Sequence, residues 1–175
     1  ELSIDGSGDF TSMMISECSR KEIKIKKRVF FPDSLGIFYH AMTQFIGFKN
    51  FGDEYKMMGL ASYGKPIYFE KIKENLFIKS KELFKLNLDY FDHQKINFNY
   101  SHINSTLIPN IYNKNLEILF QKETMSVAET DFKKNFASSV QKVYEYYFKK
   151  ILKNIDLSSF SKNIVFAGGC TLNST

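Results

Sequence analysis

The chain has 175 residues, of which 43% are hydrophobic and 25% are charged, and its formal net charge is +5. This composition excludes an intrinsically disordered chain, because 18 Phe and 10 Tyr supply ample apolar surface for a packed core. No apolar run of about 18 residues occurs, so we expect no membrane span. The length predicts one domain or a piece of a larger one.

The positive charge comes almost entirely from lysine, since only Arg20 and Arg28 are arginines. Nucleic-acid readers depend on arginine for bidentate contacts, so we expect no nucleic-acid partner. A solvated lysine-rich surface and a site for phosphates or other anions both fit this charge. Cys18 and Cys170 form no CxxC or zinc pattern, and the first residues do not resemble a secretory signal. We therefore expect free thiols and a cytoplasmic location.

Residues 1–31 predict three antiparallel strands. Leu2 and Ile4 lead into the turn signal DGSGD at 5–9, and a second strand follows over 10–18. Residues 22–26 alternate polar and apolar side chains with a period of two, as a half-buried strand does. The expected result is an antiparallel meander.

Residues 32–76 predict a helical segment. The sequence Pro-Asp-Ser at 32–34 is a helix-start signal, and apolar residues recur every three or four positions over 35–46. A shorter helix is predicted to start at residues 52–54 and to end near residues 63–66, and a third over 68–76. These helices are expected to form part of a helical crossover.

Residues 77–125 are interpreted as an elaboration on the domain. The alternation at 84–88 predicts a strand, 97–115 a loop and 115–121 a short helix. Insertions on a rigid scaffold commonly carry specificity, so this segment is a candidate for acceptor or partner contacts. A purely structural elaboration fits equally well.

Residues 126–175 contain the clearest helix, over 131–153, followed by a buried strand at 163–167 that runs into the sequence GGCTLN. A strand, a double glycine and a helix-start residue are typical of a ligand-binding βα turn. Gly168 and Gly169 let a base or ribose lie against the backbone, and Asn173 can hydrogen-bond through both amide ends. Close packing of strand on helix is the alternative explanation of the two glycines.

A second candidate motif is the sequence DGSG that begins at Asp5. A carboxylate at the end of a strand can hold a divalent cation, and the N–H groups of Gly6 and Gly8 can meet phosphate oxygens. The alternative is an ordinary hairpin turn, in which Asp-Gly is common.

A third candidate is the sequence DEYKMMGLASYGKP at 53–66. On a helix, Asp53, Lys56 and Met57 share a face, and an acid, a lysine and glycines together suit a ribose hydroxyl and a phosphate. A surface salt bridge followed by a glycine that ends the helix is the alternative.

Together these features resemble one half of the actin-like, sugar-kinase-like ATP-binding fold. The expected class is therefore α/β, with a mixed sheet that opens on a three-strand meander, continues through a helical crossover and ends in a strand into GGxxxN. Four segments also look like the carbamoyltransferase family of nodulation protein U and antibiotic O-carbamoyltransferases. They are DSLG at 33–36, EYKMMGLASYGKP at 54–66, ASSVQ at 137–141 and AGGCTLNS at 167–174. Cys170 and Thr171 stand where that family usually has Val and Ala.

The resemblance implies a chemistry. Carbamoyl phosphate and ATP form carbamoyl adenylate, and the carbamoyl group then passes to a hydroxyl, usually on a sugar. Family members resemble the tRNA threonylcarbamoyl-transfer protein in their N-terminal domain, and a YrdC-like domain follows. The adenylate is generally assigned to the YrdC-like domain and the final transfer to this one.

The resemblance also assigns site residues. Asp5 is expected as a catalytic carboxylate and as a ligand of a divalent metal of the iron or magnesium type. The expected ATP-binding residues are those of the two glycine motifs and of the segment that begins at residue 53: Gly6, Gly8, Asp53, Glu54, Lys56, Gly59, Gly168, Gly169 and Asn173.

The sequence begins on Glu1 and ends on Thr175, and we expect an internal piece of a longer protein. The family's paired-His metal motif would precede Asp5. A further metal-binding Asp and the YrdC-like domain would follow residue 175, and the first lobe is also expected outside this chain. His40, His93 and His102 do not have the spacing of the pair and are expected to be structural. We therefore expect the isolated chain to be inactive and to self-associate, and a homodimer of the full protein stays open.

Two other functions remain open. One is a sugar or carboxylate kinase of the same fold, which would convert ATP to ADP without consuming carbamoyl phosphate. The other is a non-catalytic nucleotide-binding or assembly module, which would bind ATP without turnover.

Overall fold

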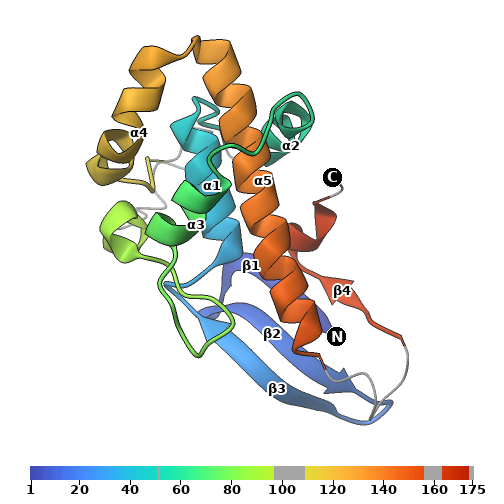
Figure 1. Cartoon of the computed structure of the whole chain (residues 1–175). Helices are drawn as coiled ribbons and strands as arrows, with labels where there is room; N and C mark the ends of the chain where they lie inside the picture. Colours follow the sequence, from blue (N-terminus) through green and yellow to red (C-terminus); the bar gives the residue numbers. More distant parts are fainter. Residues whose placement is uncertain (51, 97–108, 156–162, 174–175) are drawn as a thin grey trace.

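The computed structural model describes residues 1–50, 52–96, 109–155 and 163–173. Its sheet has the strand order β3-β2-β1-β4. Three strands form the predicted antiparallel meander: β1 (Leu2–Gly8), β2 (Thr11–Cys18) and β3 (Ile23–Phe30). β4 (Phe166–Ala167) lies parallel to β1 at the opposite edge from β3 (Figure 1). The chain is thus α/β with a mixed sheet, and the helices between β3 and β4 supply the predicted crossover.

The first hairpin turns later than predicted. β1 continues through Gly8, and the two loop residues are Asp9 and Phe10, both with left-handed backbones at φ 47° and 64°. Positive φ at both positions suits a two-residue hairpin between twisted strands. The β1–β2 register shifts between Ile4 and Gly8, so Gly6, predicted as part of a turn at 5–9, lies in an irregularity inside the strand, while Gly8 pairs with Thr11 next to the hairpin loop.

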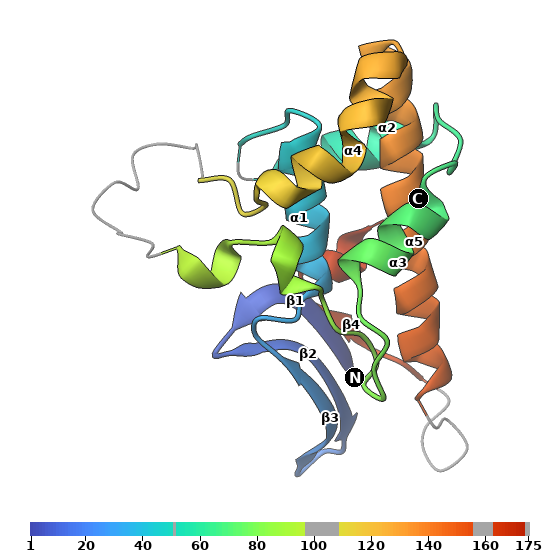
Figure 2. The same cartoon turned by 60° about the vertical axis from the view of Figure 1, so that its left-hand side comes forward.

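Five helices are described between β3 and β4. α1 packs on β1, and α5, the longest, packs along α1, α2 and α3 (Figures 1 and 2). Their bounds are α1 (Leu35–Phe45), α2 (Glu54–Ala61), α3 (Phe69–Leu76), α4 (Lys114–Ser126) and α5 (Glu129–Lys153). The predicted helices are confirmed, and the one predicted at 115–121 is longer at both ends. No helix of the described segments is long and apolar enough to cross a membrane.

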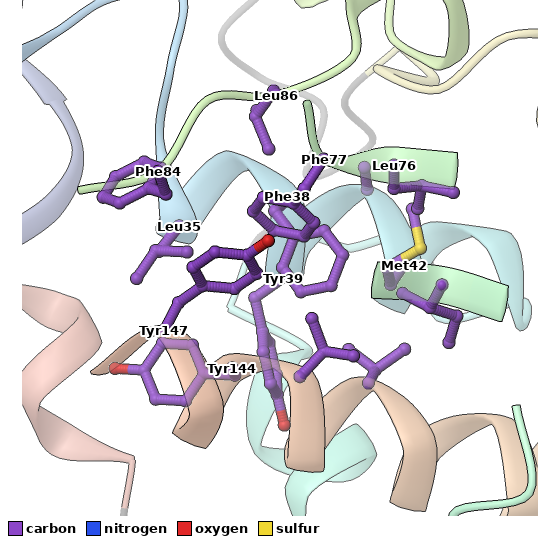
Figure 3. Packing of buried hydrophobic residues seen from close by; sticks show 14 of the residues in the cluster. Leu35, Phe38, Tyr39, Met42, Leu76, Phe77, Phe84, Leu86, Tyr144 and Tyr147 are labelled. Atoms are coloured by element: carbon purple, nitrogen blue, oxygen red, sulfur yellow. The ribbon is translucent and has the colours of Figure 1, made fainter. Parts of the chain in front are cut away.

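Aromatic side chains bind the helices to one another. Phe38 of α1 contacts Phe77 edge to face at 4.9 Å between centroids, and Phe77 stacks on Tyr147 of α5 at 4.1 Å (Figure 3). Phe136 of α5 lies 5.1 Å from both Phe45 and Phe120, which belong to α1 and α4. Such pairs add to the stabilisation that comes from burying apolar area.

The strand predicted at 84–88 is wrong. Leu86 forms only an isolated bridge with Phe77, and its N–H donates to Oδ1 of Asp33 at 2.7 Å. A 3₁₀ helix, η1 (Leu88–Tyr90), follows directly. The alternation arises because Phe84 and Leu86 enter the core while Lys85 between them stays exposed. Residues 76–78 lie alongside and form two backbone hydrogen bonds with 85–87, but the described residues form no regular strand pair here. Most of the loop predicted at 97–115 lies outside the described residues.

The end of the chain is also less regular than predicted. Only Phe166 and Ala167 of the strand predicted at 163–167 pair with β1. The prediction that this strand is buried is wrong, because β4 is an edge strand, and Val165 and Phe166 are 64% and 47% exposed. The double glycine leads into a short 3₁₀ helix, η4 (Gly169–Leu172), rather than the first turn of an α-helix. The predicted order of strand, glycines and helical turn is confirmed in this shortened form.

We expect Phe136→Ala to lower the free energy of unfolding by about 3–5 kcal/mol, because the side chain is fully buried and leaves a cavity between three helices. Phe10→Ala is the matched control, since Phe10 is 79% exposed and its loss should change stability by less than about 0.5 kcal/mol. Chemical denaturation measures both. Equal effects of the two substitutions would contradict the core described above.

Candidate functional site

A cavity of about 760 Å³ lies where β1, α1, α2, α5 and η4 meet. This volume is in the range of small-molecule sites, which run from about 300 to 1,000 Å³. Its lining includes five of the ten predicted site residues: Asp5, Gly6, Glu54, Gly169 and Asn173. The motif at the start of the chain, the motif near residue 54 and the motif at the end therefore meet in one place.

Asp5 and Gly6 are held by the first turn of α1. Ser34 caps this helix by accepting from the N–H of Ile37 at 3.1 Å, and its hydroxyl donates to the carbonyl oxygen of Asp5 at 3.0 Å. A Cβ on Gly36 would lie 2.8 Å from the backbone nitrogen of Gly6, so only glycine allows this approach. The partial positive charge of the helix N-terminus thus lies beside the strand that carries the Asp5 carboxylate.

The double glycine lies on the other side of the same strand. Gly168 has φ +89°, and a Cβ there would lie 2.2 Å from the carbonyl oxygen of Ile4. A Cβ on Gly169 would lie 3.5 Å from Oδ1 of Asp5. The close packing considered from the sequence is therefore present at Gly168, while Gly169 lies directly beside the Asp5 carboxylate in the cavity lining.

Asn173 is held by α5. Its amide nitrogen donates to Oε1 of Gln141 at 3.0 Å, and its Oδ1 accepts from Nε2 of Gln141 at 2.8 Å. Oε1 of Gln141 also accepts from the hydroxyl of Tyr39 at 2.9 Å. Both amide ends predicted to contact adenosine therefore contact a protein side chain, and this network fixes the end of η4 against α1 and α5.

The segment near residue 54 divides between cavity and surface. Glu54 lines the cavity, whereas Asp53, Lys56 and Gly59 do not. Asp53 accepts from the N–H of Asn50 at 3.1 Å and pairs with Lys56 at 2.7 Å. The hydrogen bond from Lys56 is the main cause that holds the pKa of Asp53 below its usual value. The local salt bridge weighed from the sequence is thus present.

Gly8 and Gly168 are the two other predicted residues that do not line the cavity. Gly8 belongs to the hairpin end of β1, where it pairs with Thr11. Gly168 packs against the backbone of Ile4, next to Gly169, which does line the cavity. Gly8, Asp53, Lys56 and Gly59 do not line the cavity, and their proposed binding roles stay predictions.

His40 is a cavity residue that sequence reasoning treated as structural. Its Nδ1 lies 2.6 Å from Oε1 of Glu54, so the pair joins α1 to α2. Burial raises the pKa of Glu54, but the hydrogen bond and charge of His40 outweigh this and leave it below its usual value. No spacing rule indicates the pair, because the residues belong to two helices and meet only through their packing.

Cys170 presents a buried thiol near the same carboxylates. Burial, reinforced by the negative charges of Asp5 and Glu54, raises the pKa of Cys170 to about 12. The backbone carbonyl of Cys170 accepts from the hydroxyl of Tyr144 at 2.5 Å, which ties η4 to α5. The thiol is therefore neutral and weakly reactive at physiological pH.

The possible metal ligands near the cavity are His, Cys, Asp and Glu side chains. Among the described residues, no three His, Cys, Asp or Glu side chains form a group that could hold a metal ion. Asp5 contributes a single carboxylate, which does not make a metal site. The residues present do not fit a metal by themselves.

Comparison with known proteins places these features in context. Residues 1–175 match the family model described as carbamoyltransferase N-terminus. An uncharacterised protein of Synechocystis, sll1178, is 30% identical over 98% of this chain and 26% of its own length. The nodulation protein NolNO of Sinorhizobium fredii is 28% identical over 98% of the chain and 23% of its own length. NolO of Bradyrhizobium diazoefficiens, another nodulation protein, is 29% identical, with coverages of 98% and 28%. The chain thus spans about a quarter of the length of these curated relatives.

We expect Gly168→Ala to destabilise the protein by at least about 2 kcal/mol, because it combines an unfavourable φ with a clash against the Ile4 carbonyl. Gly59→Ala is the control: nothing lies within 4 Å of its Cβ, and alanine in a helix gains about 0.5–1 kcal/mol. Thermal unfolding of both variants measures the difference. A stable Gly168→Ala protein would refute the close approach of η4 to β1.

Alkylation should separate the two cysteines. With a pKa of about 12, Cys170 holds on the order of one thiolate in 10⁴ at pH 8, so iodoacetamide should modify it at least about 100-fold more slowly than the exposed Cys18. Mass spectrometry of peptides measures each site separately. Because the thiolate fraction of Cys170 increases with pH until the pH exceeds its pKa, its alkylation rate should still increase with pH at pH 10. Equal rates at pH 8 would contradict the burial of this thiol.

Proposed function

Because the chain belongs to the carbamoyltransferase N-terminal family, we propose that it forms part of an ATP-dependent O-carbamoyltransferase. The enzyme moves a carbamoyl group from carbamoyl phosphate, by way of carbamoyl adenylate, to a hydroxyl, and the proposed acceptor is a sugar. The proposal concerns the full-length protein, since the chain spans about a quarter of its curated relatives.

One observation carries the proposal: Asp5 and Gly6, which belong to β1, and Gly169, which is far from them in the sequence, line one cavity, and Gly168 packs against the same strand at Ile4. Backbone N–H groups without a Cβ can approach phosphate oxygens closely, and an α-helix N-terminus beside them favours negative charge. We assign Gly6 to the phosphate side of ATP, where a phosphate oxygen would take the place of Asp5 Oδ1, which accepts from the Gly6 N–H at 2.7 Å in this structure. We assign Gly169 and Asn173 to the adenosine side.

The fold and domain assignments belong to the same proposal. The antiparallel meander, the helical crossover and the return to a strand parallel to β1 support an actin-like lobe. Residues 1–175 then form part of an N-terminal domain, with the predicted divisions at 1–31, 32–76, 77–125 and 126–175. Its first lobe and a YrdC-like domain would lie elsewhere in the full-length protein.

Asp5 is the proposed acidic residue of the transfer site. Its carboxylate lies beside Gly169 and next to the α1 N-terminus, where it can orient the reacting group. A divalent metal of the iron or magnesium type remains part of the proposal only for the full-length protein. The described residues form no group that could hold a metal ion, so the remaining ligands would have to come from other parts of that protein.

The test is the stoichiometry of the full-length protein. Incubation with ATP, carbamoyl phosphate and a methyl glycoside should release AMP and consume carbamoyl phosphate, whereas the 175-residue chain alone should do neither. Conversion of ATP to ADP without consumption of carbamoyl phosphate would indicate a kinase instead. Binding of ATP with no turnover would indicate a non-catalytic nucleotide-binding module.

Asp5→Asn in the full-length protein should lower the rate of carbamoyl transfer by about 100-fold or more, because it removes a charge at the reacting centre and preserves shape. Asp9→Asn is the matched control, since Asp9 belongs to the adjacent hairpin and does not line the cavity. AMP release measured by chromatography reports both rates. Full activity of Asp5→Asn would exclude the proposed role.

A further inference from the structure

His40 and Glu54 form a hydrogen-bonded pair in the cavity, separate from the two glycine motifs. Nδ1 of His40 lies 2.6 Å from Oε1 of Glu54, and both residues line the cavity. The lowered pKa of Glu54 means that this carboxyl is ionised near neutral pH and accepts the hydrogen bond. Because an ionised carboxylate only accepts hydrogen bonds, Nδ1 of His40 carries the proton of this contact, and in the base form of the ring the lone pair is on Nε2.

Nε2 of His40 has no hydrogen-bond partner within the described part of the chain, although it is buried. The His40 side chain is only 12% exposed, so bulk water does not readily take the partner's place. A buried polar atom without a partner is unfavourable in a folded protein and calls for an explanation. A ligand that enters the cavity with a hydroxyl group could donate the missing hydrogen bond to Nε2 of His40.

His93 shows that a buried histidine in the cavity wall does not by itself have the features of a general base. It also lines the cavity and also has an unpartnered ring nitrogen, Nδ1. Its other nitrogen, however, lies 2.8 Å from the carbonyl oxygen of Pro32, a neutral acceptor. Only His40 is backed by a carboxylate in the described part of the cavity, and a carboxylate stabilises the imidazolium that forms when a base takes up a proton.

We propose that Nε2 of His40 is the base that takes the proton of the acceptor hydroxyl, with Glu54 as its positioning residue. The inference rests on the proposed carbamoyl transfer. The O–H bond of the acceptor breaks and its proton moves to Nε2 while the acceptor oxygen attacks the carbamoyl carbon. The new C–O bond forms, the bond from that carbon to the phosphate oxygen breaks, and AMP leaves with the electron pair. The imidazolium then releases its proton to solvent, so no oxidant or further reactant is needed.

The deciding variant is His40→Asn in the full-length protein. Asparagine places its Nδ2 near the former Nδ1, so it keeps the hydrogen bond to Glu54 and the link between α1 and α2, but it has no Nε2. We expect the single-turnover rate of transfer from carbamoyl adenylate to fall by about 10²–10⁴-fold, with the dissociation constant for ATP unchanged. Methyl α-D-glucopyranoside and water serve as the acceptor probes.

Each other outcome overturns the inference in a distinguishable way. A His40→Asn protein that transfers at the wild-type rate would show that the pair is only a clamp between two helices. A weakened affinity for ATP with a normal transfer rate at saturation would show that His40 contacts the ribose. If the wild-type protein releases no AMP in response to carbamoyl phosphate, the proposed function fails and the inference falls with it.

Glu54→Gln provides an independent check. Glutamine keeps an oxygen that accepts from Nδ1 but cannot stabilise the imidazolium, so transfer should fall by about tenfold or more. Glu70→Gln is the matched control, because Glu70 pairs with Lys73 on α3 and does not line the cavity. Equal transfer rates of the two glutamine variants would exclude the positioning role, provided that both unfold at the wild-type temperature.

Discussion

The close approach of two backbone segments to β1 is the constraint on which the rest of the structure depends. Gly36, in the first turn of α1, lies against Gly6, and Gly168 lies against the carbonyl of Ile4. Neither segment tolerates a Cβ at its contact. The helix start and the double glycine therefore reach the same short stretch of strand, whose irregular pairing leaves the Asp5 carboxylate at the cavity.

The long helix α5 turns this contact into a rigid site. Its buried aromatic face packs against α1 and α4, and it approaches η4 through polar groups. Gln141 links Tyr39 to Asn173, and Tyr144 donates to the carbonyl of Cys170. One helix thus supplies both the apolar packing that positions α1 and the hydrogen bonds that position η4, so the two sides of the cavity are fixed to a common support.

The electrostatics of the cavity follow from the same arrangement. Burial, with smaller contributions from the charges of Asp5 and Glu54, raises the pKa of Cys170 and keeps its thiol protonated, and Glu54 is hydrogen-bonded to His40. The cavity has two sides. Gly6 and the N-terminus of α1 form a side suited to phosphate, and His40 and Glu54 form a side suited to proton transfer. This division agrees with the transfer of a carbamoyl group from an adenylate to a hydroxyl.

The sequence by itself determined the meander, the positions of the main helices and the family, because turn signals, the helical spacing of apolar residues and the EYKMMGLASYGKP and GGCTLN segments are local properties. The half-buried pattern expected at residues 22–26 is wrong, since Ile23 and Ile25 of β3 are 62% and 42% exposed. It also indicated Asp5, Gly6, Glu54, Gly169 and Asn173, which do line the cavity. It failed at residues 84–88, where alternation reflects burial without a regular strand pair, and at residues 5–9, where Gly6 lies in an irregular strand and not in a turn. Only the tertiary structure decided that Asp53 and Lys56 pair with each other away from the cavity, that Asn173 is held by Gln141, and that His40 meets Glu54. Those contacts depend on how helices approach one another, and no spacing along a single segment records that approach.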